Sequence, residues 1–230
     1  HSPMVLKNIR LRIPKGKTTA IVGASGSGKT TLLKLLLNYY QPTEGAVRVG
    51  DVNIANIQNR LWRQKCGAVL QDGFVFNDTI ARNIALGDEI IDKVRLLHAV
   101  KAANIQTYIE SLPLGYNTRI GAEGQGLSLG QKQRILIARA VYKSPEYLFF
   151  DEATSALDAY NEMIVMENLA EHFKKRTMVI VAHRLSTVMN ADYIVVLDSG
   201  EIVEQGTHEE LAYNRGAYYH LVKNQLELGG

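Results

Sequence analysis

An eight-residue stretch between an apolar strand and an apolar helix constrains the fold more than any other feature. The residues Gly23 to Thr30, GASGSGKT, join the short apolar run 18–23 to the helical run 29–40. They match the pattern G-x-x-x-x-G-K-[ST], in which backbone N–H groups surround phosphate oxygens. A glycine turn that only begins a helix is the alternative interpretation. A dinucleotide fingerprint fails, because the third glycine that it requires would stand at position 31, which is threonine.

This loop predicts a set of nucleotide contacts. Lys29 is expected to reach the β- and γ-phosphates of a nucleoside triphosphate, and the Thr30 hydroxyl is expected to contact Mg²⁺. The expected phosphate-binding residues are Gly23, Ala24, Ser25, Gly26, Ser27, Gly28, Lys29, Thr30 and Thr31.

Strands and helices alternate along most of the chain. Alternating residues predict a strand at 5–13, and apolar runs predict strands at 147–151, 177–183 and 192–198 with helices between them. From about Asn77 to Ser144 the pattern turns helical. This order predicts an α/β protein with a largely parallel sheet that is interrupted by a helical insertion.

Composition excludes several classes of protein. Hydrophobic residues make up 46% and charged residues 21% of the 230 residues, and the net charge is +3. The densest basic cluster is 174–176, too small for the basic stripe of a nucleic-acid binder, so no nucleic-acid partner is expected. The single cysteine, Cys66, lies in an apolar strand and predicts a buried, inert thiol. No apolar run is long enough for a membrane helix.

Two acids end the apolar strand YLFFDE. Asp151 at the strand end suits a ligand of Mg²⁺, and Glu152 beside it could polarise an attacking water. Two solvated acids at a strand end are the alternative. Gln71 and His183 also end strands, and each taken alone would be an ordinary surface or structural residue.

Five motifs in one order carry a family resemblance. The phosphate loop, VLQ, LSLGQ, LFFDEATSALD and VAHR together resemble the ATP-binding cassette ATPases over essentially the whole chain. The resemblance implies a RecA-like P-loop core with an antiparallel β subdomain near the N-terminus and an inserted α-helical subdomain. The expected organisation is a single nucleotide-binding domain, 1–230, with the core and β subdomain in 1–76 and 145–230 and the helical signature subdomain in 77–144.

The resemblance also implies roles for residues at the matching positions. Glu152 would be the catalytic carboxylate, His183 a switch at the γ-phosphate, and Gln71 a contact to Mg²⁺ and water. Thr30, Gln71 and Asp151 would hold the metal. Asp158 would contact a second copy of the chain.

LSLGQ stands where the family has the signature LSGGQ, with Leu129 in place of its first glycine. In the family this segment covers the γ-phosphate of ATP held by the other copy, which implies nucleotide contacts from Ser128, Gly130 and Gln131. Ser128-x-x-Gln131 is also a capping box, sufficient to begin the next helix without nucleotide. That alternative leaves Gly130 unexplained. Asp158 has a similar second interpretation as a helix N-cap.

Two segments are most similar to exporters of the family. VFNDTIARNIALG follows Gln71 as in exporters, and Glu123 stands where exporters have an acidic loop that touches the transmembrane domain. The sequence around the signature is most similar to that of bacterial peptide or bacteriocin exporters. The expected function is ATP hydrolysis that powers export, through an ATP-dependent homodimer. The Gln71 and Glu123 regions would contact the transmembrane domain of the same transporter.

The resemblance implies a position at the cytoplasmic face of the cell membrane, with spanning segments and the adenine-stacking aromatic of the family upstream of His1. The alternatives are the ATPase subunit of an importer, which would lack the loop at Glu123, and a non-transport ATPase of the same family. A chromosome-maintenance ATPase needs a long coiled coil between Gln71 and the signature, where this chain has short helices. A regulatory module without turnover would lack Glu152.

Overall fold

The fold is described from a computed structural model, which covers residues 4–122, 126–182 and 184–228. The chain divides into two compact units. Unit 1 contains His1–Cys66, Phe149–Asp151 and Lys175–Gly230, and unit 2 contains Gly67–Leu148 and Glu152–Lys174. In the described residues, no helix is long and apolar enough to cross a membrane.

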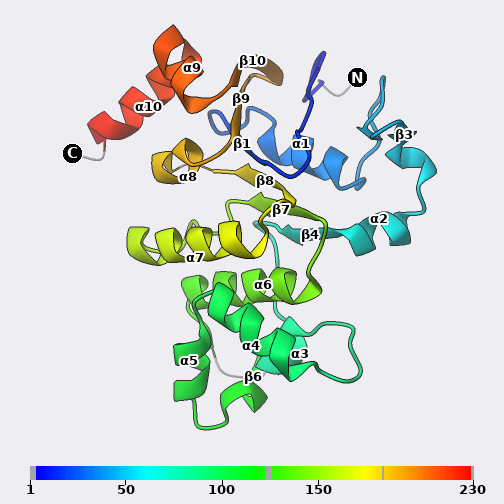
Figure 1. The fold of residues 1–230 in the computed structure, drawn as a ribbon, viewed down its shortest axis with the longest axis vertical. Helices are drawn as coiled ribbons and strands as arrows, with labels where there is room; N and C mark the ends of the chain where they lie inside the picture. Colours follow the sequence, from blue (N-terminus) through cyan, green and yellow to red (C-terminus); the bar gives the residue numbers. More distant parts are fainter. Residues whose placement is uncertain (1–3, 123–125, 183, 229–230) are drawn as a thin grey trace. The chain divides into compact units, whose positions relative to one another are not determined.

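A six-stranded sheet organises the apolar strands (Figure 1), and its order is β10-β9-β1-β8-β7-β4. β1 is parallel to β8 and to β9, whereas β10 is antiparallel to β9. Nearly all residues of the central strands are buried, as expected of a parallel sheet with both faces covered. The strands are β1 Thr18–Val22, β4 Cys66–Val69, β7 Tyr147–Asp151, β8 Thr177–Val181, β9 Tyr193–Asp198 and β10 Glu201–Gly206.

The other elements of unit 1 follow β1 or lie near the C-terminal end of the chain. Trp62 is buried on α2, and its indole N–H donates to the carbonyl of Leu36 at the end of α1. The buried Tyr218 of α10 is joined by its hydroxyl to His208 of α9, which fixes these two helices to one another. These elements are α1 Lys29–Leu36, β2 Arg48–Val49, β3 Val52–Asn53, a 3₁₀ turn Ile54–Asn56, α2 Asn59–Lys65, α8 Leu185–Met189, α9 His208–Asn214 and α10 Ala217–Leu228.

Unit 2 is mostly helical and is centred on α6 (Figure 1), whose buried face runs from Ile135 to Tyr142. Arg139 of α6 donates to the carbonyls of Asn83 and Phe74, which ties α6 to α3 and to the segment before it. The elements are β5 Asp78–Thr79, α3 Ile80–Ile84, α4 Lys93–Ala102, α5 Gln106–Ser111, a 3₁₀ turn Gly115–Asn117, β6 Arg119–Ile120, α6 Leu129–Lys143 and α7 Ala159–His172.

The structure confirms the predicted fold class but corrects one predicted strand near the N-terminus. The α/β class, the parallel sheet and the helical insertion are confirmed, and Cys66 is buried as expected. The strand predicted at 5–13 is wrong. Asn8 adopts a left-handed φ of 51°, which breaks the pleat, and the Lys7 N–H instead donates to the carbonyl of Gly200. The antiparallel β subdomain is represented by the β2–β3 pair.

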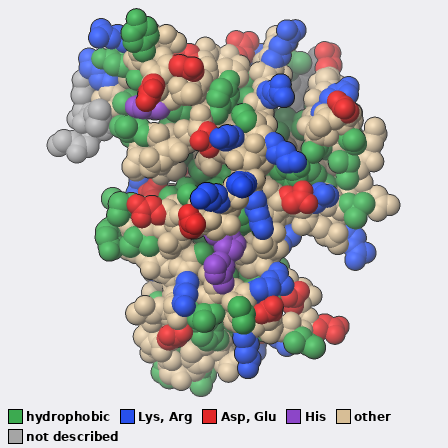
Figure 2. Space-filling view, in the orientation of Figure 1, with side chains coloured by type: hydrophobic (Ala, Val, Ile, Leu, Met, Phe, Trp, Pro, Cys, Tyr) green, Lys and Arg blue, Asp and Glu red, His purple; other side chains and the backbone are tan. Residues whose placement is uncertain are grey.

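Charged side chains of both signs are interspersed over the face drawn in Figure 2. Lys and Arg lie next to Asp and Glu on most of this face rather than forming one continuous basic stripe. This distribution matches the small net charge of +3.

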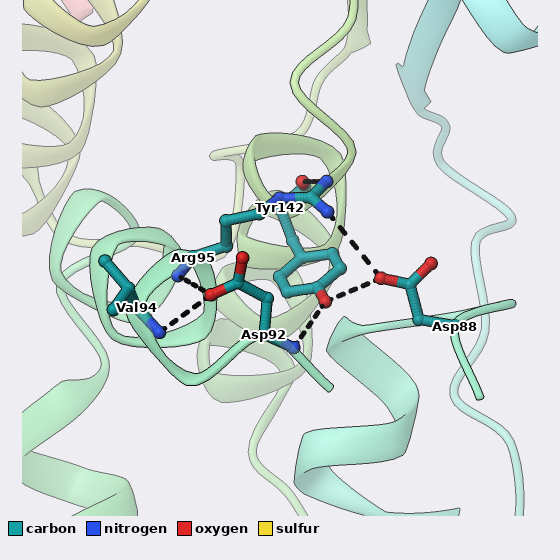
Figure 3. Close-up of polar contacts among 5 residues, drawn as sticks. All are labelled: Asp88, Asp92, Val94, Arg95 and Tyr142. Atoms are coloured by element: carbon teal, nitrogen blue, oxygen red, sulfur yellow. Dashed lines mark hydrogen bonds and ion pairs between the residues drawn. The ribbon is translucent and has the colours of Figure 1, made fainter. Parts of the chain in front are cut away.

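A buried tyrosine joins α6 to the start of α4 (Figure 3). The Tyr142 hydroxyl donates to Asp88 Oδ2 at 2.7 Å and accepts from the Asp92 N–H at 3.1 Å. The Arg95 guanidinium lies over the Tyr142 ring, 4.3 Å from its centroid, and donates to the Tyr142 carbonyl. Asp92 is the N-cap of α4 and accepts from the N–H groups of Val94 and Arg95. One hydroxyl therefore connects the cap of α4 with the C-terminal turn of α6.

We expect Tyr142→Phe to lower the free energy of unfolding by about 1 kcal/mol, because two hydrogen bonds are lost while the ring stays packed. The corresponding fall in melting temperature is about 2–4 °C for a chain of this size. Urea denaturation and thermal melting measure it. Tyr213→Phe is the control, because Tyr213 is 89% exposed and should change neither value. Equal stability of the two variants would contradict the conclusion that the Tyr142 hydroxyl stabilises the junction between α6 and the start of α4.

Candidate active site

The phosphate loop, Gly23 to Thr30, begins directly after β1 and ends at the second residue of α1. Gly28 is the N-cap of α1 with a φ of 103°, a conformation that glycine adopts without steric cost. The Lys29 ammonium donates to the carbonyls of Gly23 at 2.6 Å and Ala24 at 3.0 Å, so it lies against the backbone of its own loop. The loop therefore gathers one cation and a helix N-terminus, which together favour an anion.

Glycine is required at position 23 by close backbone packing. A Cβ atom placed on Gly23 would lie 2.3 Å from the carbonyl oxygen of Leu197 in β9 and 2.7 Å from Ser27 Oγ. Ser27 is held in turn from the β9–β10 hairpin, because its carbonyl accepts from the Gly200 N–H at 3.0 Å. The start and the middle of the loop are thus both fixed against β9 and its turn.

The residues expected to hold Mg²⁺ in unit 1 lie together. The Thr30 hydroxyl donates to Asp151 Oδ2 at 2.9 Å, across 121 positions of sequence. Asp151 ends β7 and is only 1% exposed. A hydroxyl and a carboxylate side by side are oxygen donors of the kind that Mg²⁺ prefers, so this pair fits the ion.

Glu152 lies in unit 2, immediately after Asp151 in the chain. Its φ is 55°, in the left-handed region that residues with a side chain rarely adopt. Such conformations persist only where the surroundings fix them, and they concentrate at functional sites. The Glu152 carbonyl accepts from the side-chain amide of Gln133 at 3.4 Å.

The signature segment forms the N-terminus of α6. Ser128 Oγ accepts from the Gln131 N–H at 3.1 Å, and Gln131 Oε1 accepts from the Ser128 N–H at 2.9 Å, which confirms the capping box. Leu129 is 63% exposed, whereas a Cβ on Gly130 would lie 3.2 Å from the Ala156 carbonyl oxygen. Gly130, which the cap alone left unexplained, is therefore constrained by this packing.

Asp158 is the N-cap of α7, as one interpretation predicted. Its Oδ1 accepts from the Asn161 N–H and its Oδ2 from the Asn161 side-chain amide, both at 2.8 Å. These bonds, the backbone one first, hold the pKa of the Asp158 carboxyl below its ordinary value, so the group is charged at neutral pH. Its contact with a second copy stays a prediction.

The geometry does not test the roles expected of three further residues, Gln71, His183 and Glu123. Gln71 follows β4 and is exposed. His183 and Glu123 lie outside the described residues. The structure thus brings Gly23 to Thr31 and Asp151 together in unit 1, and it places Gln71, Glu152 and the signature segment in unit 2.

Sequence reasoning missed Gln133. It lies two positions after Gln131 on α6 and donates from Nε2 to Ser155 Oγ at 2.9 Å. A second glutamine in a helical run resembles an ordinary solvated side chain, so no local signal distinguished it. The available signal was indirect: Ser128 and Gln131, at the start of the same helix, had already been assigned to the site, which would have pointed to a nearby polar residue.

Comparison with known proteins bears on the family and the fold of the chain. Residues 6–155 match the family model described as ABC transporter. The chain is 46% identical over 227 residues to leukotoxin translocation ATP-binding proteins of Mannheimia glucosida and Mannheimia haemolytica, which covers 99% of this chain and 32% of those proteins. It therefore spans about a third of the length of these relatives. A solved structure of a bacterial Atm1-family ABC exporter with ATP bound superimposes with a TM-score of 0.93 at 40% identity, over 96% of this chain and 39% of that one.

We expect Gly23→Ala to destabilise the fold and to abolish nucleotide binding, because its Cβ would overlap the Leu197 carbonyl. Overpacking of this kind costs about 1–3 kcal/mol, in addition to the backbone strain. Gly45→Ala is the matched control: its φ is 82° and nothing lies within 4 Å of the new Cβ, so it carries the backbone strain alone. Chemical denaturation and ATP titration are the measurements. A Gly23→Ala protein as stable as Gly45→Ala would show that the contact with β9 is not limiting.

Proposed function

This chain belongs to the ABC transporter family and is an ATP-hydrolysing domain of exporter type, and from that premise we propose that it powers the export of a peptide or protein. The observation that carries the ATP-hydrolysing part of the proposal is the Thr30–Asp151 contact, in a loop whose Lys29 ammonium lies against the Gly23 and Ala24 carbonyls. The relatives named for leukotoxin translocation favour a protein or peptide cargo over a small molecule.

Each site residue has one task in this proposal. Lys29 leaves the Gly23 and Ala24 carbonyls to bind the β- and γ-phosphates, and the loop N–H groups bind the remaining phosphate oxygens. Thr30, Asp151 and Gln71 would hold Mg²⁺, and the ion would supply charge neutralisation on the phosphates. Glu152 orients the attacking water, and His183 responds to the γ-phosphate.

The proposed active form is a head-to-tail homodimer around two ATP molecules. Ser128, Gly130 and Gln131 of each copy face the γ-phosphate held by the other, and Asp158 contacts the second copy. The single domain, with residues 77–144 as its signature lobe, meets a transmembrane domain of the same transporter through the Gln71 and Glu123 regions. The location would then be the cytoplasmic face of the membrane.

If Glu152 orients water, Glu152→Gln should bind ATP normally and lose turnover by about 10²–10⁴-fold, the usual contribution of a general base. The variant should also accumulate an ATP-bound dimer, because hydrolysis no longer separates the copies. Steady-state ATPase assays and gel filtration with ATP provide the two readouts. Glu44→Gln removes an exposed carboxylate elsewhere and should behave as wild type. Turnover of Glu152→Gln within about threefold of wild type would remove Glu152 from the mechanism.

Ser128→Asp separates the helix cap from the nucleotide contact. Aspartate accepts from first-turn N–H groups as well as serine does, so melting should shift by only a few degrees, whereas Ser128→Ala should cost about 1 kcal/mol. A carboxylate facing the γ-phosphate in a dry interface is strongly repelled. The variant should therefore bind ATP as a monomer, fail to dimerise and hydrolyse almost nothing. Normal dimerisation and turnover would mean that Ser128 serves the cap alone.

A further inference from the structure

The side-chain amide of Gln133 forms hydrogen bonds through both its nitrogen and its oxygen to the loop that follows β7. Nε2 donates to Ser155 Oγ at 2.9 Å and, more weakly, to the Glu152 carbonyl at 3.4 Å. Oε1 accepts from the Ala156 N–H at 2.8 Å. Gln133 is half-buried on α6, in the same unit as its three partners. One side chain therefore binds this loop at its first, fourth and fifth residues.

Two backbone hydrogen bonds shape this loop from within. Inside it, the Ser155 N–H donates to the Glu152 carbonyl at 3.2 Å and the Leu157 N–H donates to the Thr154 carbonyl at 3.0 Å. These bonds shape two short turns within the loop, whose Ala153 and Leu157 side chains are buried. The Gln133 amide attaches the loop to α6, at the residue whose left-handed φ of 55° needs support from its surroundings.

We propose that Gln133 is the positioning residue for the Glu152 carboxylate. It acts by holding the Glu152 carbonyl, the Ser155 hydroxyl and the Ala156 N–H, which fixes the direction of the Glu152 side chain. This inference rests on the proposed role of Glu152 as the group that orients water. An error of about 1 Å in the position of such a group can cost about 10²-fold in rate.

The position of Gln133 on α6 also gives the contact a second consequence. Ser128 and Gln131 lie within the first turn of the same helix, and Gln133 follows them by less than one further turn. When a second copy binds at the start of α6, any displacement of that turn moves the Gln133 amide, and with it the Glu152 backbone. The signature segment of one copy is thereby connected to the catalytic carboxylate of the same copy.

The test is Gln133→Leu, which removes all three hydrogen bonds at nearly constant volume. We expect kcat for ATP hydrolysis to fall about 10–100-fold, with KM for ATP and ATP-dependent dimerisation changed by less than about threefold. Gln106→Leu is the matched control, because the Gln106 amide of α5 donates to its neighbour Glu110 at 3.0 Å and lies outside the site. It should leave kcat unchanged.

Ser155→Ala supplies a second, milder variant, which keeps the test valid even if Gln133→Leu fails to fold. It removes the 2.9 Å bond and should lower kcat by a smaller factor, again without affecting KM. In the double variant the two losses should not multiply, because both remove the same contact. Thermal melting of each variant separates positioning from general loss of stability.

The outcomes are distinguishable. Wild-type kcat in Gln133→Leu, together with an inactive Glu152→Gln, overturns the role of Gln133 and leaves the proposed function intact. A loss of ATP binding in parallel with kcat, or multiplicative losses in the double variant, also overturns it. An active Glu152→Gln would instead remove Glu152 from the mechanism, and with it the premise of this inference, while ATP hydrolysis by the chain would stand. A fall in kcat alone, with non-multiplicative losses, supports the inference.

Discussion

The hydrogen bond from Thr30 to Asp151 is the contact on which the rest of the site depends. It joins the first turn of α1 to the carboxyl end of β7, a strand of the same six-stranded sheet as β1. Ligands bind at the carboxyl ends of strands in such sheets because the loops of neighbouring strands meet there. Burial of Asp151 keeps water from competing for its oxygens, and the hydroxyl partner offsets part of the cost of that burial.

Much of this arrangement could be predicted from the sequence, because its signals are local. The glycine loop between an apolar strand and a helix specified α1 and its phosphate contacts, and the run YLFFD specified β7 with its terminal acid. The failures occurred where the decisive partner lies far away in the sequence. Residues 5–13 alternate as a strand does, yet Lys7 bonds to Gly200 and Asn8 turns the chain. Neither the φ of Glu152 nor the three bonds of Gln133 leave a local pattern, since each depends on tertiary packing.

Ser128 and Asp158 illustrate why structural and functional interpretations need not compete. Each places an oxygen acceptor at a helix N-terminus, where unpaired N–H groups require one. In the proposed dimer, the same N-terminus that needs an acceptor also favours an incoming γ-phosphate, because the cap side chain occupies only some of the unpaired N–H groups and the helix dipole attracts an anion. A helix cap and an anion contact can therefore both be served by one helix N-terminus. Of these two capping residues, Asp158 carries a negative charge, which the hydrogen bonds from Asn161 stabilise. A phosphate would therefore be repelled by Asp158 but not by Ser128.

The leucine in the signature follows from the different surroundings of two adjacent positions. Leu129 is the first residue of α6 and is exposed, and its φ is negative, so a side chain fits there without backbone strain. Gly130 packs against the Ala156 carbonyl and the Leu157 side chain, so even a methyl group would press on the loop that Gln133 holds. Substitution at the first position leaves that packing intact, whereas substitution at the second would displace the loop that carries Glu152. Only the second glycine of the family signature is thus fixed by the interior of this chain, and any constraint on the first must come from what binds the outer surface of α6.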